Sequence, residues 1–208
     1  EPLPLEAQGV DSVCADFCEK IMPYTAGNTH PRFFGWVHGN GTPGGMLAEM
    51  LAGAINANLG GREHAPIYVE RAVINWCRQL FDFPESSSGL MVTGTSMATL
   101  IALTVARNRY VAGDVRQDGL YGDTRLIAYS SAEAHRCISK TIEILGLGTK
   151  HLRSIPVDRR FKMDLERLRQ AIARDRASGK TPFCVVATAG TVNTGAIDDL
   201  AKIADICA

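Results

Sequence analysis

The chain has 208 residues, of which 46% are hydrophobic and 21% charged, with Lys plus Arg and Asp plus Glu both at 22. This length allows one substantial core or two small ones, and the composition is typical of a soluble globular protein. A formal net charge of zero excludes a global field that would attract nucleic acid or an anionic membrane. No apolar run approaches membrane-spanning length, so we expect neither nucleic-acid nor membrane association.

Helical patterns dominate the first 81 residues. Apolar residues at helical spacing predict a helix over 5–21. The stretch 43–59 is rich in Ala, Met and Leu, which predicts a helix buried on several sides. A third helix is predicted over 66–81, with Val69, Val73, Trp76 and Leu80 inward and Glu70, Arg71 and Arg78 outward.

From residue 89 onward, short apolar runs alternate with helical stretches. Strands are predicted at 90–93, 125–129, 152–157 and 183–188, and helices at 97–111, 133–145, 164–177 and 198–207. This alternation favours a mainly parallel α/β sheet covered on both faces. Ligands of such sheets gather at the carboxyl ends of the strands, where we expect Gly94–Ser96, Ser130–His135 and Ala189–Thr194 to share one rim.

Six cysteines are spread along the chain, and only Cys14 and Cys18 are close together. A single C-x-x-x-C lacks the second pair of ligands that a zinc site needs, so no metal site is expected. Most of the other cysteines stand in apolar runs, where Cys behaves as a small core residue. Cysteines placed in this way favour a reducing compartment, and we expect a cytoplasmic protein.

The turn Gly94-Thr95-Ser96 joins an apolar run to a helical stretch and admits three interpretations. As structure alone, its hydroxyls cap the helix by accepting bonds from first-turn amides. As a nucleophile elbow, G-x-S-x-A resembles the G-x-S-x-G of α/β-hydrolases, with Ser96 as the nucleophile. As a phosphate cradle, the unpaired first amides and the positive end of the helix dipole would hold an anion.

Two further segments bear on a site at this rim. His135 follows the predicted strand 125–129 and the pattern S-x-x-E, which places it near the first turn of the next helix. It could be a partly buried, hydrogen-bonded histidine, or a ring that stacks on a cofactor or handles a proton. The loop 187–195 is crowded with hydroxyls and glycines, and Asp198 and Asp199 after it can cap the final helix.

The stretch 30–44 carries aromatics, histidines and glycines. The cluster between His30 and His38 indicates a pocket wall beside the adjacent glycines. Residues 39–44 match G-x-G-x-x-G letter by letter, but the acidic residue at the right spacing, Glu63, does not follow a strand. The pattern therefore gives little support to a dinucleotide site.

Five ordered segments carry a family resemblance. They are HPRFFGWVHGNGTPGGMLAEMLAGAIN (30–56), YVERAVINW (68–76), VTGTSMATLIAL (92–103), SSAEAH (130–135) and VATAGTVNTGAIDDL (186–200). This set resembles the pyridoxal-phosphate-dependent group II amino-acid decarboxylases, the family of aromatic-amino-acid, glutamate and histidine decarboxylases. The resemblance implies an α/β protein of the aspartate-aminotransferase-like fold (fold type I), whose large domain has a mainly parallel sheet and is preceded by N-terminal helices.

The domain division implied by the resemblance has two parts. Residues 1–65 would form an N-terminal helical segment with a substrate-pocket loop, and 66–208 part of the cofactor-binding large domain. The implied activity is decarboxylation of an L-amino acid to the amine and CO2 by a homodimer, with pyridoxal 5'-phosphate as the cofactor, whose ring acts as an electron sink.

The resemblance also assigns roles to individual residues. Thr95 and Ser96 would hold the cofactor phosphate, His135 would stack on the pyridine ring as the catalytic residue, and Thr191 would line the cofactor site. Trp36, Val37 and His38 fall where the family places substrate-pocket residues. Because Val37 leaves only half of the aromatic pair expected for aromatic substrates, the sequence does not favour an aromatic substrate.

The main departure from the family pattern is an absence. The family's Schiff-base lysine and the aspartate that pairs with the pyridine nitrogen come after the equivalent of Ala208, and no lysine here matches the lysine motif. We expect a piece of a longer enzyme that does not catalyse alone. Three alternatives stay open: an α/β-hydrolase using Ser96, a pyridoxal-dependent aldehyde synthase on the same scaffold, and a non-catalytic remnant of the fold.

Overall fold

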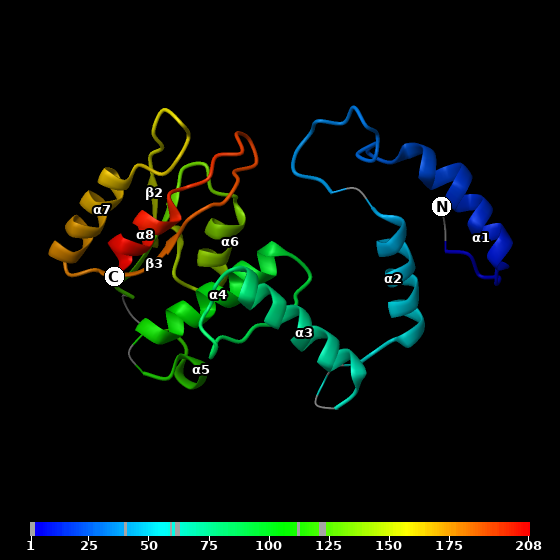
Figure 1. Ribbon diagram of the computed structural model, residues 1–208, viewed down its shortest axis with the longest axis horizontal. Helices are drawn as coiled ribbons and strands as arrows, with labels where there is room; N and C mark the ends of the chain where they lie inside the picture. Colours follow the sequence, from blue (N-terminus) through cyan, green and yellow to red (C-terminus); the bar gives the residue numbers. More distant parts are fainter. Residues whose placement is uncertain (1–2, 40, 59, 61–62, 112, 121–123) are drawn as a thin grey trace. The chain divides into compact units, whose positions relative to one another are not determined.

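The computed structural model describes residues 3–39, 41–58, 60, 63–111, 113–120 and 124–208. The chain divides into two compact units, residues 1–62 and residues 63–208, whose elements are labelled in Figure 1. None of the described helices is both long and apolar enough to cross a bilayer.

The first unit is helical. It contains α1 (Val10–Asp16), a π-helical turn (Phe17–Ile21), a 3-10 turn (Met22–Tyr24) and α2 (Pro43–Ile55). Thr42 caps α2, because its Oγ1 accepts the Gly45 N–H at 3.1 Å. The predicted burial of this helix is wrong for the described unit: Met46 and Met50 are 71% and 64% exposed, since the described part of this unit supplies no layer that covers them.

The second unit holds a three-stranded parallel sheet and most of the helices. Its helices are α3 (Ala65–Leu80), α4 (Thr95–Tyr110), α5 (Val115–Asp118), α6 (Cys137–Ile144), α7 (Leu165–Ala177) and α8 (Leu200–Cys207), with a 3-10 turn at Thr149–His151. Its strands are β1 (Leu126–Ser131), β2 (Leu152–Ile155) and β3 (Thr181–Val186), in the order β2-β1-β3. Both pairings are parallel, as the strand–helix alternation predicts.

The predicted strand at 90–93 is wrong. These residues pair with no strand; instead the Met91 N–H donates to Glu70 Oε1 on α3 at 2.8 Å. The carboxylate supplies the acceptor that a neighbouring strand would otherwise provide, so a short apolar run crosses the surface without joining the sheet. The spacing of apolar residues in the sequence cannot distinguish such a run from a strand at the edge of a sheet.

Helices cover both faces of the sheet, which confirms the predicted layers (Figure 1). Successive residues of β1 point to opposite faces. Ile127 and Tyr129 pack with side chains of α7 and α8, whereas Leu126 and Ala128 pack with side chains of α4 and α6. All six residues of β1 are buried, as expected of the central strand of a parallel sheet.

Two contacts fix the direction of α4 along α6. Near their N-terminal ends, Thr99 Oγ1 lies 4.0 Å from Cys137 Sγ, and near their C-terminal ends Arg107 Nη1 donates to the Leu145 carbonyl at 2.9 Å. The two helices therefore run parallel. Because α6 begins just after the carboxyl end of β1, the N-terminus of α4 lies on that same side of the sheet, which we call the carboxyl rim.

Candidate functional site

The turn before α4 supplies free amides at the carboxyl rim. Gly94 has a φ of 147°, and its carbonyl accepts the N–H groups of Met97 and Ala98, each at 3.1 Å. Because α4 begins at Thr95, the amides of Thr95 and Ser96 have no acceptor within the helix. Both side chains are exposed, so amides, hydroxyls and the positive end of the helix are open to an anion.

The nucleophile-elbow interpretation of Ser96 requires a strand that ends at the turn. Residues 90–93 form no strand, so the turn lacks the sharp strand-to-helix bend that holds such a serine. This geometry favours the anion cradle over the elbow.

His135 lies at the rim, in the connection between β1 and α6. Its ring is exposed, and its Nδ1 accepts the Cys137 N–H at 3.2 Å. An accepting Nδ1 leaves the proton of the neutral imidazole on Nε2. One ring nitrogen is thus used to orient the ring, while the other points away from that bond and can face a ligand.

The helix after β1 begins later than predicted. The S-x-x-E pattern forms a turn, in which Ser131 Oγ accepts the Glu133 N–H at 3.1 Å and the Ser131 carbonyl accepts the Ala134 N–H at 3.0 Å. The helix α6 itself starts only at Cys137, so His135 lies just before its first turn, close to where the pattern predicts it.

Thr191 lies in the loop that follows β3, the neighbour of β1, and only 4% of it is exposed. Its Oγ1 lies 2.6 Å from Thr194 Oγ1 and accepts the Ala196 N–H at 3.2 Å. The hydroxyl therefore shapes its own loop. The loop carries Thr191 to the rim that β1 and β3 share.

The two aspartates after this loop have different roles. Asp199 caps α8 as expected, accepting the Lys202 N–H at 3.2 Å. Asp198 is 3% exposed and does not cap the helix; it accepts the Met163 N–H at 2.7 Å and the Thr188 N–H at 2.8 Å. Its partners lie 35 and 10 residues away, so no local pattern could have distinguished it from a cap.

The candidate substrate residues Trp36, Val37 and His38 belong to the first unit. The ring of Phe33 lies 6.0 Å from that of Trp36 and 5.9 Å from that of His38, so these side chains form a local aromatic cluster. Trp36 and Val37 are 71% and 73% exposed. Because they lie in the other unit, their relation to the rim stays a prediction.

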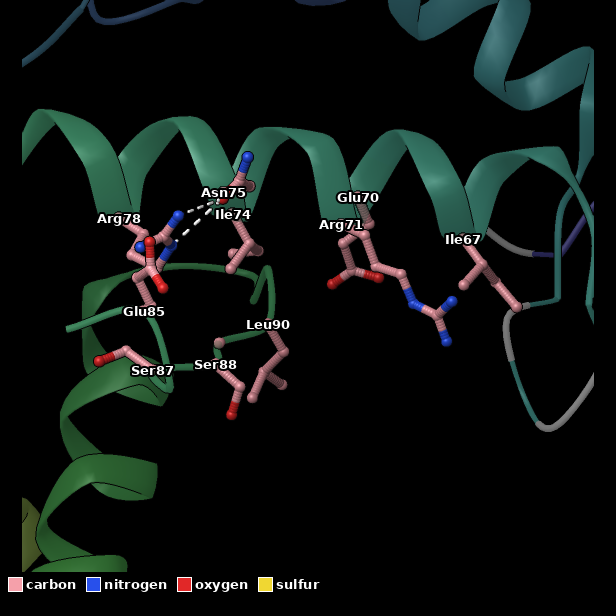
Figure 2. A pocket seen from close by; sticks show the side chains of 11 residues that line it. Ile67, Glu70, Arg71, Ile74, Asn75, Arg78, Glu85, Ser87, Ser88 and Leu90 are labelled. Atoms are coloured by element: carbon pink, nitrogen blue, oxygen red, sulfur yellow. Dashed lines mark hydrogen bonds between the residues drawn. The ribbon is translucent and has the colours of Figure 1, made fainter. Parts of the chain in front are cut away.

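A cleft of about 450 Å³ lies between α3 and residues 85–90, and none of the predicted site residues lines it (Figure 2). Glu70, predicted to point outward, lines it, as does Arg78, which donates to Asn75 Oδ1 at 2.9 and 3.1 Å. The predicted inward face of α3 is wrong in part: Trp76 and Leu80 are 60% and 80% exposed. The face of α3 turned toward residues 85–90 carries Glu70, whose carboxylate accepts the Met91 N–H.

One thiol lies on the strand next to β1. Burial, with a smaller contribution from Cys207, raises the pKa of Cys184, on β3, to about 11. The thiol is therefore protonated at neutral pH, and a protonated, half-buried thiol is a poor nucleophile. Cys184 acts as a packing residue on the sheet and not as a reactive group.

Comparison with known proteins decides the family. The profile of the pyridoxal-dependent decarboxylase conserved domain matches residues 1–208. The chain belongs to this family. An aromatic-L-amino-acid decarboxylase of Bacillus atrophaeus is 34% identical over 86% of the chain, and a cysteine sulfinic acid decarboxylase of Rattus norvegicus is 33% identical over 99% of it. The chain spans 36% and 42% of the lengths of these two relatives.

Solved structures of family members share the fold. The glutamate decarboxylase domain of a Vibrio parahaemolyticus enzyme matches with a TM-score of 0.93 and 28% identity, covering 100% of this chain and 47% of that one. The apo form of mouse CSAD matches with a TM-score of 0.87 and 32% identity, covering 99% and 44%. These matches confirm the predicted fold type I of the pyridoxal-dependent decarboxylases.

Proposed function

We propose that this chain is part of a pyridoxal-phosphate-dependent decarboxylase that converts an L-amino acid to its amine and CO2. The observation that carries the proposal is the carboxyl rim: the N-terminus of α4 and the loops after β1 and β3 lie on the same side of the sheet. This arrangement brings the phosphate-binding type of turn to the same edge as His135. Family membership over the whole chain supports the same chemistry.

The described residues fit the phosphate and the ring of the cofactor. Nothing lies within 4 Å of the place where a Cβ on Gly94 would stand, so the space beside the turn is open. The amides and hydroxyls of Thr95 and Ser96 can donate to a dianionic phosphate there. His135 offers a flat, exposed ring whose orientation is set by the Cys137 amide.

Each residue then has a defined task. Thr95 and Ser96 bind the phosphate, His135 stacks on the pyridine ring and holds it in place, and Thr191 lines the site from the loop after β3. Pyridoxal phosphate, when bound, supplies an electron sink for the bond that breaks at Cα. Trp36, Val37 and His38 are assigned to the substrate pocket, and the incomplete aromatic pair favours a non-aromatic amino acid.

The assembly and compartment follow from related observations. We assign a homodimer, because the family resemblance implies one. A cytoplasmic location is supported by cysteines that are all free thiols, as in a reducing compartment.

The test is a spectroscopic titration of the full-length protein with pyridoxal phosphate, followed by product analysis with L-amino acids. We expect a visible absorption band that borohydride abolishes, and release of an amine with CO2. If the product is an aldehyde instead of an amine, the protein is a pyridoxal-dependent aldehyde synthase and not a decarboxylase. Labelling of Ser96 by a fluorophosphonate, with no cofactor band, would instead establish a serine hydrolase.

A further inference from the structure

The loop that carries Thr191 is closed by a buried carboxylate. Backbone bonds pair its two sides: Gly190 and Thr191 donate to the Ala196 carbonyl at 3.1 and 3.0 Å, and the Asp198 N–H donates to the Thr188 carbonyl at 2.9 Å. At the base of the loop, Asp198 Oδ2 accepts the Thr188 N–H at 2.8 Å. Asp198 is thus bonded to Thr188 twice, once through its main-chain N–H and once through its side-chain carboxylate.

The second oxygen of Asp198 fastens the loop to a different part of the fold. Oδ1 accepts the Met163 N–H at 2.7 Å, in the turn that leads into α7. That turn is itself fixed, because Asp164 donates its N–H to the Pro156 carbonyl at 2.9 Å, just beyond β2. Asp198 therefore connects the loop after β3 to the segment after β2, at the carboxyl rim.

The environment of Asp198 makes this connection costly to lose. The residue is 3% exposed, and a buried carboxylate without its donors carries a large desolvation penalty. Both donors are main-chain amides, which cannot turn away as side chains can. The carboxylate thus leaves the loop one well-defined position relative to the sheet.

We propose that Asp198 is a positioning residue that holds Thr191 at the cofactor site. It touches neither substrate nor cofactor; it acts by fixing the base of the loop from Thr188 to Asp198. The inference rests on the proposed function, since Thr191 is assigned to the site there.

The first arm of the test needs no cofactor. Amide hydrogen exchange is measured on the full-length apo protein and on Asp198→Asn, whose amide group can accept from only one of the two N–H donors. We expect the Gly190, Thr191 and Ala196 amides to exchange at least about 10-fold faster in the variant. Asp199→Asn is the matched control, because it removes the neighbouring carboxylate, which caps α8 outside the loop.

The second arm asks whether the loop serves the cofactor. Apo protein is titrated with pyridoxal phosphate, and we expect Asp198→Asn to raise the Kd on the order of 10-fold and Asp199→Asn to leave it within about 2-fold. If Asp198 acts through Thr191, then adding Asp198→Asn to Thr191→Ala raises the Kd little beyond Thr191→Ala alone.

The outcomes separate the inference from the proposed function. A wild-type protein that binds no pyridoxal phosphate contradicts the proposed function. Given wild-type binding, a loosened loop with an unchanged Kd, or Kd effects that multiply in the double variant, overturns the positioning role. If Asp198→Asn does not fold, Asp198→Glu retains the charge and both oxygens, and the same exchange and titration measurements then decide.

Discussion

The Tyr129 hydroxyl on the central strand donates a 2.9 Å hydrogen bond to Asp175 Oδ2 on α7. Arg153 on β2 donates to both oxygens of the same carboxylate, with its closest contact at 2.7 Å. Burial, followed by the bond to Asp175, raises the pKa of Tyr129, so this hydroxyl stays neutral and remains a donor. The trio links two strands to the helix that covers them.

Replacing Asp175 is expected to change the pH dependence of stability. Hydrogen bonding from Arg153 lowers the pKa of Asp175 below its ordinary 3.8. Its stabilisation is therefore fully present above that pH and is lost as the pH falls through the lower folded-state pKa. Asp175→Asn should cost about 3 kcal/mol at pH 7, as for other broken buried pairs, and the deficit should shrink below about pH 4.

Urea unfolding of wild type and Asp175→Asn at pH 7 and at pH 3 measures this difference. The control is Glu166→Gln, which changes an exposed carboxylate on the same helix. A deficit that is the same at both pH values would show that Asp175 stabilises α7 by packing and not through its charge.

Removing the ring of His135 should abolish most turnover while leaving the fold intact. In the full-length enzyme, His135→Ala is expected to lower kcat by at least about 100-fold, because a positioned catalytic side chain typically contributes that much. Steady-state kinetics and the cofactor absorption band are the measurements. His151→Ala is the control, since His151 directly precedes β2, at the opposite end of the strands. Near-normal activity of His135→Ala would contradict its assigned role.

Substitution of Ser96 should weaken phosphate binding. Ser96→Ala removes one hydroxyl donor but leaves the helix amides, so we expect the Kd for pyridoxal phosphate to rise about 10-fold. Fluorescence titration of the apo protein with pyridoxal phosphate measures this Kd. Ser139→Ala on α6, where the hydroxyl donates to the carbonyl of Arg136 just before that helix, is expected to bind as wild type. Equal affinity of both variants would show that the hydroxyl of Ser96 does not contact the phosphate.

Gly94 should resist substitution because of its backbone angle. A φ of 147° is a conformation that residues with a Cβ rarely adopt, although the space around Gly94 is open. Gly94→Ala should therefore destabilise the protein by about 1–3 kcal/mol and distort the turn before α4. The same change at Gly53, inside α2, should be neutral or stabilising by up to about 1 kcal/mol. Thermal unfolding of both variants tests the contrast, and equal effects would show that strain is not the cause.

The local sequence predicts most elements of the second unit and the edge where the site lies. Strand–helix alternation gives three of the four predicted strands, because a buried strand and an amphipathic helix each leave a periodic pattern that a short window contains. The fourth, at 90–93, fails because an apolar run becomes a strand only when a partner strand lies beside it. Here the partner is the side chain of Glu70.

The sequence by itself determined the family, the parallel α/β layers and the rim with Thr95, Ser96 and His135. Only the tertiary structure decided which face α3 turns toward residues 85–90. It also decided the pairing of Asp175 with Arg153 and Tyr129, and the different roles of Asp198 and Asp199. The physical reason is the separation along the sequence between the groups that interact. Patterns report what a residue does within its own helix or strand, whereas a buried carboxylate is defined by donors that the fold brings from distant segments.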